Sequence, residues 1–193
     1  MNVTRRFVQG GLLAVGLLSL NGCVQSVYPW YEERDVVFDP ALAGTWLVDA
    51  DDGKDCVVTI TAGPNRKVRQ YNVDIATASC PDADSNISGG AQLLQVGSSR
   101  YLNVWDDTYY LNSLMKIRRD GDGFALIAMD PESLELLMTK SKPRLRARLQ
   151  AHAIVPDDVL VTSETTDLRR FLRENAGKES LFNTENEFRI RRR

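Results

Sequence analysis

The fold class is decided by the stretch Gln70-Tyr71-Asn72-Val73-Asp74-Ile75-Ala76-Thr77. Aromatic or β-branched residues occupy every second position, and polar residues or alanine fill the positions between them. Successive side chains of a β-strand point to opposite faces, so this period of two is typical of a strand with one buried face. The stretch therefore predicts a sheet that covers a hydrophobic core.

Similar strand-like segments lie on both sides of this stretch, separated by turn residues. They are residues 42–48, 56–61, 91–96, 101–105, 109–118, 124–129, 159–162 and 187–190. Asp120-Gly121-Asp122-Gly123 is typical of a tight hairpin, and residues 81–90 have the composition of a loop. We expect a mainly β α+β fold, a curved antiparallel sheet or partial barrel of roughly seven to nine strands with one or two helices packed on it.

Two segments late in the chain have helical patterns. Asp130 can cap a helix that ends by Lys142, with Pro131 in its first turn. A second helix is expected to begin at Ser163 or Thr165 and to stop at Gly177. Residues 144–153 suit either a strand or a basic helix.

The first 22 residues have the layout of an export signal, with Arg5 and Arg6 before a short apolar run. From residue 10 to residue 20 the run is too short to span a bilayer, which takes roughly 20 apolar residues. The segment Leu20-Asn21-Gly22-Cys23 resembles the lipobox of bacterial lipoproteins. That resemblance implies cleavage before Cys23, a diacylglycerol on its sulfur and an acyl chain on its amine. A plain secretory signal with an incidental cysteine is the alternative.

An anchor of this kind would decide where the protein resides, because two or more acyl chains hold a protein stably at a membrane. The residue after the expected lipidated cysteine is Val24 rather than an aspartate. By resemblance to enteric lipoproteins, this favours the outer membrane. The expected location is therefore the bacterial cell envelope, with the protein facing the periplasm. The expected organisation is a signal peptide over residues 1–22, a lipidated N-terminus and tether over 23–40, and a single β-rich domain over 41–193. The aromatic residues Tyr28, Trp30 and Tyr31 either meet the membrane interface or cover the domain.

The charge of the mature chain argues against a nucleic-acid partner. Two of the 24 Lys and Arg residues lie in the leader, which leaves 22 against 26 acidic residues, a net charge near −4. Residues 189–193 are a local basic exception. They are read as the solvated end of a last strand or as a contact with anionic lipid.

Cys56 and Cys80 are the cysteines left after Cys23, and export would place them where thiols usually pair. A disulfide between them would stabilise the fold by about 3 kcal/mol. If residues 63–65 turn a hairpin, however, Cys56 faces the neighbourhood of Val73. The chain must then fold back after residue 78 for the bond to form.

Aromatic residues supply the candidate ligand contacts. Gly44-Thr45-Trp46 resembles the Gly-x-Trp opening of lipocalin-like barrels, in which the tryptophan plugs one end. Trp105, Tyr109 and Tyr110 either form a sugar-binding shelf or pocket mouth, or pack in the core and across strands.

No catalytic or metal-binding constellation is evident. The sequence has a single histidine, His152, and no Gly-x-Ser-x-Gly turn that would present a serine nucleophile to it. We interpret His152 as a hydrogen-bonded, partly buried side chain. The acidic turn over residues 49–55 is read as a loop rather than a calcium site. Asp106 and Asp107 are adjacent on a strand and so point to opposite faces. We expect a protein that is not an enzyme and has no cofactor and no metal.

Several of these segments together are similar to a loose set of uncharacterised bacterial envelope lipoproteins: residues 44–46, 101–104, 120–123 and 160–163. The resemblance implies no known chemistry. The expected function is non-catalytic binding of a protein or another envelope component. The alternative is a lipocalin-like carrier of a small apolar ligand.

Overall fold

The computed structural model describes residues 24–49, 55–63, 69–75, 87–107, 110–140, 145–150, 158–182, 184 and 187–193. Cys23, Cys80, Tyr109 and His152, which the sequence singled out, lie outside the described residues.

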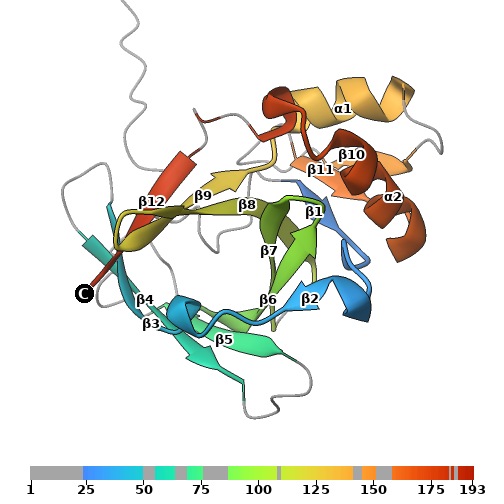
Figure 1. Cartoon of the computed structure of the whole chain (residues 1–193). Coiled ribbons are helices and arrows are strands. Elements are labelled where there is room, and N and C mark those ends of the chain that lie inside the picture. Colours follow the sequence, from blue (N-terminus) through green and yellow to red (C-terminus); the bar gives the residue numbers. More distant parts are fainter. Residues whose placement is uncertain are drawn as a thin grey trace, which may run out of the picture.

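Eight antiparallel strands close into a barrel, seen end-on in Figure 1. The barrel strands are β3 (Gly44–Asp49), β4 (Asp55–Ala62), β5 (Gln70–Ile75), β6 (Ile87–Val96), β7 (Ser99–Asp106), β8 (Asn112–Asp120), β9 (Gly123–Ala128) and β12 (Glu187–Arg192). Neighbours in sequence pair as a meander, and β12 closes the ring by pairing with both β9 and β3. The expected mainly β α+β fold is confirmed.

The alternation along the strands fills the barrel. Tyr71, Val73 and Ile75 of β5 are buried, whereas Asp74 is exposed. The interior cluster consists of Leu42, Trp46, Val48, Cys56, Val58, Ile60, Tyr71, Val73, Ile75, Ala91, Leu93, Leu102, Val104, Met115, Ile117, Phe124, Leu126 and Ile190. Because these side chains contact one another, the described interior is a packed core.

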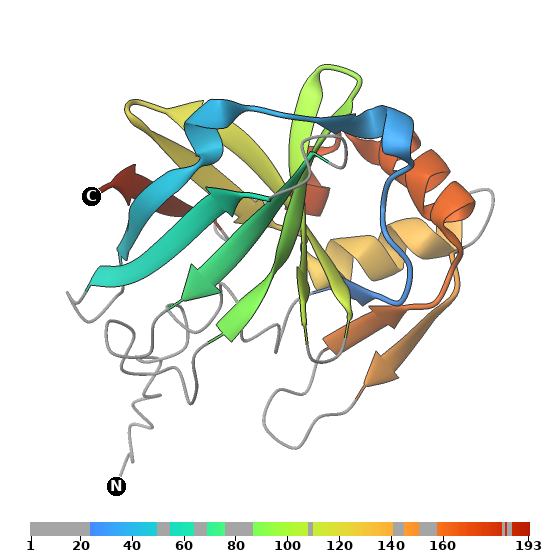
Figure 2. The same cartoon turned by 90° about the horizontal axis from the view of Figure 1, so that it is seen from below.

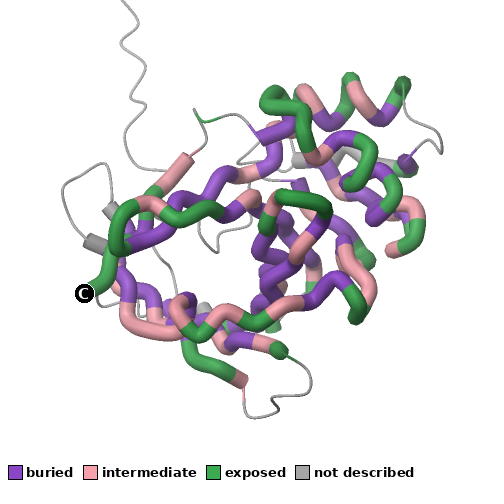
Figure 3. Tube along the Cα trace, viewed as in Figure 1, coloured by how far each residue is buried: buried purple, intermediate pink, exposed green. Residues whose placement is uncertain are grey.

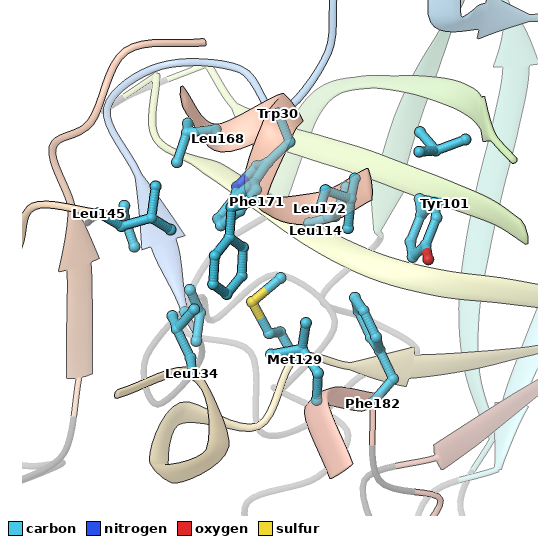
Figure 4. Packing of buried hydrophobic residues seen from close by; sticks show 14 of the residues in the cluster. Trp30, Tyr101, Leu114, Met129, Leu134, Leu145, Leu168, Phe171, Leu172 and Phe182 are labelled. Atoms are coloured by element: carbon cyan, nitrogen blue, oxygen red, sulfur yellow. The ribbon is translucent and has the colours of Figure 1, made fainter. Parts of the chain in front are cut away.

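A second hydrophobic core lies outside the barrel, against β6 to β9 (Figure 4). It is covered by α1 (Pro131–Lys140), α2 (Thr165–Asn175), the 3-10 helix η5 (Glu179–Phe182), and strands β1 (Gln25–Ser26), β10 (Ala147–Gln150) and β11 (Asp158–Val161). Leu93 and Leu102 join the barrel core, while their neighbours Leu94 and Tyr101 join the outer one. These strands are buried on both faces, which Figure 3 shows as long buried stretches of the tube.

Residues 24–40, expected to be part of a tether, are built into the domain. β1 pairs with β8 on one side and with β11 on the other, and Val24 and Trp30 are buried in the outer core. The segment continues through η2 (Glu33–Asp35), β2 (Val36–Val37) on β6, and η3 (Pro40–Leu42), which leads across one end of the barrel into β3 (Figure 2). Residues 24–40, which belong to the expected tether over 23–40, therefore contribute strands and core side chains to the fold.

The local signals for the helices hold with small shifts. Asp130 Oδ1 accepts the backbone N–H of Ser133 at 2.7 Å, so Asp130 caps α1 as expected. The Ser163 hydroxyl instead accepts the backbone N–H of Arg146 at 2.6 Å, and α2 begins at Thr165. The ambiguous segment 144–153 contains strand β10, paired with β11. No helix in the described parts of the chain is long and apolar enough to cross a bilayer.

The expected loop over residues 81–90 is wrong for residues 87–90, which begin β6. Gly90 lies opposite Trp105 in the ladder, and a Cβ atom on Gly90 would lie 2.1 Å from the indole atom Cζ2. A glycine here gives the ring room to lie across the neighbouring strand. The Asp120–Gly123 hairpin is confirmed by the pairing of those two residues.

Candidate functional site

A small pocket opens at the end of the barrel that η3 covers. Its volume is about 20 Å³, room for a single water molecule. Apolar side chains of the barrel core form its floor, and guanidinium groups line its rim. We call it the arginine pocket; its lining residues are Asp39, Leu42, Leu93, Arg100, Ile117, Arg118, Arg119 and Phe124.

Arg100, near the start of β7, is held on two sides. Its Nη1 donates to Asp39 Oδ2 at 3.0 Å, and its Nε donates to Gln95 Oε1 at 3.3 Å. The Gln95 amide is itself fixed, because it donates to the carbonyl oxygens of Gly97 and Ser99. The Arg100 guanidinium is therefore oriented although it is exposed to solvent.

Arg119, near the end of β8, lies over an aromatic ring. Its guanidinium carbon is 4.3 Å from the centroid of the Phe124 ring, a cation–π contact. Within the described part of the chain, this is the contact that orients it, and it forms no ion pair there. No described residue accepts a hydrogen bond from its guanidinium, so its donors face solvent on that part of the surface.

Arg118, by contrast, is occupied. Its Nη2 donates to Glu187 Oε2 at 2.8 Å, and Arg189 Nε donates to the other oxygen of that carboxylate at 3.2 Å. Burial alone would raise the pKa of Glu187, but the hydrogen bonds from Arg118 and Arg189 outweigh it and hold the pKa below its ordinary value.

Beneath the pocket, Trp46 makes the barrel end rigid. Its indole N–H donates to the Leu42 carbonyl at 2.9 Å, and its ring meets the edge of Phe124 with centroids 5.3 Å apart. Arg192 lies over the indole and donates to the Ala43 carbonyl at 2.9 Å. The pocket floor is thus fixed by packing and hydrogen bonds.

This arrangement suits the binding of an anion. Guanidinium groups recognise carboxylate and phosphate oxygens with charge-assisted hydrogen bonds, and a rigid apolar floor lowers local solvation. Among the described residues, no three His, Cys, Asp or Glu side chains are grouped so that they could hold a metal ion.

The aromatic candidates Trp46 and Trp105 lie on opposite faces of the barrel wall. Trp46 is inside the barrel, whereas Trp105 packs across Gly90 on the outer face of β7. Tyr110 is 68% exposed with a positive φ of 56°, and Tyr109 lies outside the described residues. The shelf of Trp105, Tyr109 and Tyr110 stays a prediction, because Tyr109 is not among the described residues.

Sequence reasoning missed the buried ion pair of Asp35 and Arg169. The Arg169 guanidinium donates to both carboxylate oxygens of Asp35, through Nε to Oδ2 and through Nη2 to Oδ1 at 2.6 Å. Burial would raise the pKa of Asp35, but the hydrogen bond from Arg169 and that from the Glu32 backbone lower it overall. The partners are 134 residues apart, and no local pattern signals their pairing.

No protein-family model, curated protein or solved structure matches this chain.

Proposed function

We propose that this protein is a non-catalytic, lipid-anchored component of a bacterial envelope that binds an anionic group of another envelope molecule at the arginine pocket. The observation that carries the binding role is the oriented pair of guanidinium groups, Arg100 and Arg119, over a rigid apolar floor. The anchor rests on the leader sequence that ends at Cys23.

The geometry favours recognition over chemistry. The cavity of about 20 Å³ accepts one small group, such as a carboxylate or a phosphate oxygen, and not a whole substrate. Arg119 has donors to offer, and Arg100 is held by Asp39 and Gln95. A ligand would therefore dock an exposed anionic group against the rim while most of its body stays outside.

The anchor is tested by growing cells with radiolabelled palmitate. Label on the wild-type protein and its loss in Cys23→Ser support lipidation. An unlabelled wild-type protein, together with unchanged membrane retention of Cys23→Ser, would refute it.

The pocket is tested by cross-linking and pull-down from intact envelopes with the lipidated protein. Arg119→Gln should lose most of the captured partner, because it removes the guanidinium that offers its donors at the rim. Arg173→Gln, an exposed arginine of α2, is the matched control and should retain the wild-type yield. Equal yields from the two variants would count against the pocket.

A lipocalin-like carrier is the second candidate, because the barrel closes with eight strands and Trp46 packs in one end. Against a carrier stands the packing of the described interior side chains against one another. Native mass spectrometry of the purified domain discriminates: a co-purified apolar ligand would favour the carrier.

A further inference from the structure

We infer that the end of the domain opposite the arginine pocket rests on the bilayer, with Val27, Tyr28 and Tyr110 in the membrane interface. This inference rests on the proposed lipid anchor at Cys23. It assigns the molecule an orientation that the anchor alone does not give.

The first step is the place where the mature chain enters the fold. β1 pairs with the start of β8, Gln25 with Ser113 and Ser26 with Asn112, whereas Arg119 lies near the end of β8. Arg119 lies six positions after Ser113 along β8, a distance of about 20 Å. The chain therefore enters the domain far from the arginine pocket.

The second step is the shortness of the link. Val24 is 2% exposed and packs in the outer core. Cys23 is its direct neighbour, so their Cα atoms are about 3.8 Å apart. A lipid on Cys23 would hold this side of the domain against the bilayer, with no spacer that would let it turn over.

The third step is the surface beside this entry point. Val27 and Tyr28 are 43% and 44% exposed, and Tyr110 is 68% exposed. In sequence, Tyr28 follows Ser26 by two residues and Tyr110 precedes Asn112 by two, so both leave the β1–β8 pairing at the end where Ser26 meets Asn112, while Cys23 precedes its other end. Tyrosine rings with an apolar body and a polar tip favour the membrane–water interface. We call these three residues the tyrosine patch.

Tyr110 gives independent support for a membrane contact, because its exposed ring does not pack in either core. Its backbone has φ of 56°, a conformation that side chains other than those of glycine, asparagine and aspartate seldom adopt. The ring is the most exposed of the large hydrophobic side chains in the described residues. A strained backbone that presents an exposed ring fits a contact outside the domain.

The opposite end is the alternative membrane-contacting surface, because it carries the arginine pocket and the basic residues after Ile190. Arg191 and Arg192 pair with β3 at that end, where Arg192 lies over Trp46. Attraction to anionic lipid fades over about 10 Å at 0.1 M salt, less than the length of β8. Only one end can therefore contact the bilayer, and the short link to Cys23 selects the tyrosine patch.

The test uses the full lipidated protein, reconstituted in vesicles of phosphatidylethanolamine and phosphatidylglycerol that contain a nitroxide-labelled lipid. A fluorophore is placed on Asp107→Cys or on Ser98→Cys, exposed residues at the two ends of β7. Protein without an introduced cysteine measures background labelling. We expect strong quenching at position 107 and little at position 98. In a Tyr28→Ser/Tyr110→Ser background, quenching at position 107 should fall at least twofold.

The outcomes separate the two proposals. Quenching that is equal at both positions, or stronger at position 98, overturns the orientation while vesicle retention still supports the anchor. A protein that carries no lipid and does not remain with the vesicles refutes the anchor itself. Circular dichroism of the tyrosine double variant checks that it is folded; if quenching at position 107 is unchanged in that folded variant, the tyrosine patch is not the contact.

Discussion

At the scale of single residues, the pair of Asp35 and Arg169 holds the N-terminal segment to helix α2. Both side chains are nearly buried, and the contact is bidentate. Removing one partner would leave a poorly solvated charge. We therefore expect Arg169→Met to lower the free energy of unfolding by about 3 kcal/mol, measured by urea denaturation.

The control is Arg173→Met, one turn further along α2 and exposed to solvent. It should change the free energy of unfolding by no more than about 0.5 kcal/mol. If both variants lose the same stability, the charge pair is not what holds the segment in place.

At the scale of elements, the pairing of β4 with β5 decides which residues lie opposite Cys56. Gly63 donates to the Gln70 carbonyl at 2.8 Å, so the connection runs from residue 63 to residue 70, longer than the expected turn at residues 63–65. Val73 pairs with Ile60, and the last described pair is Val58 with Ile75. Cys56 therefore does not lie opposite Val73, and the register expected from a turn at residues 63–65 is wrong.

The disulfide between Cys56 and Cys80 stays a prediction, because Cys80 lies outside the described residues. Replacing both cysteines by serine should lower the free energy of unfolding by about 3 kcal/mol. Peptide mapping of unreduced protein should recover the two cysteines in one linked pair. Recovery of Cys56 in a peptide linked to Cys23 would contradict both this pairing and the lipid anchor.

The elements also show what could be predicted from the sequence and what could not. Residues 70–75 form the expected strand because the alternation of their side chains is local information. Gly90 looks like loop until Trp105, fifteen residues later, lies across it. Arg100 and Arg119 meet at one pocket because the meander brings the start of β7 beside the end of β8. Contacts of this kind depend on register, which composition does not reveal.

At the scale of the whole molecule, two cores share one set of strands. β6 to β9 contribute side chains to the barrel interior on one face and to the helix-covered core on the other. The ion pair of Asp35 and Arg169 ties the N-terminal segment to α2, and the carboxylate of Glu187 ties β12 to β8 within the barrel. We therefore expect the described domain to unfold as one unit, with its acid stability set by these carboxylates.

Both Asp35 and Glu187 have pKa values lowered by their arginine partners, in spite of burial, which alone would raise them. In the unfolded chain such groups titrate near about pH 4. Below that pH the unfolded state binds more protons than the folded state, so stability that is present above pH 4 is lost as the pH falls through the lower folded values. The free energy of unfolding, measured by urea titration between about pH 2 and pH 7, should fall with acid below this point. In Asp35→Asn/Glu187→Gln the fall should be shallower, even though the variant is less stable at neutral pH. An unchanged acid slope in that variant would place the titrating groups elsewhere in the chain.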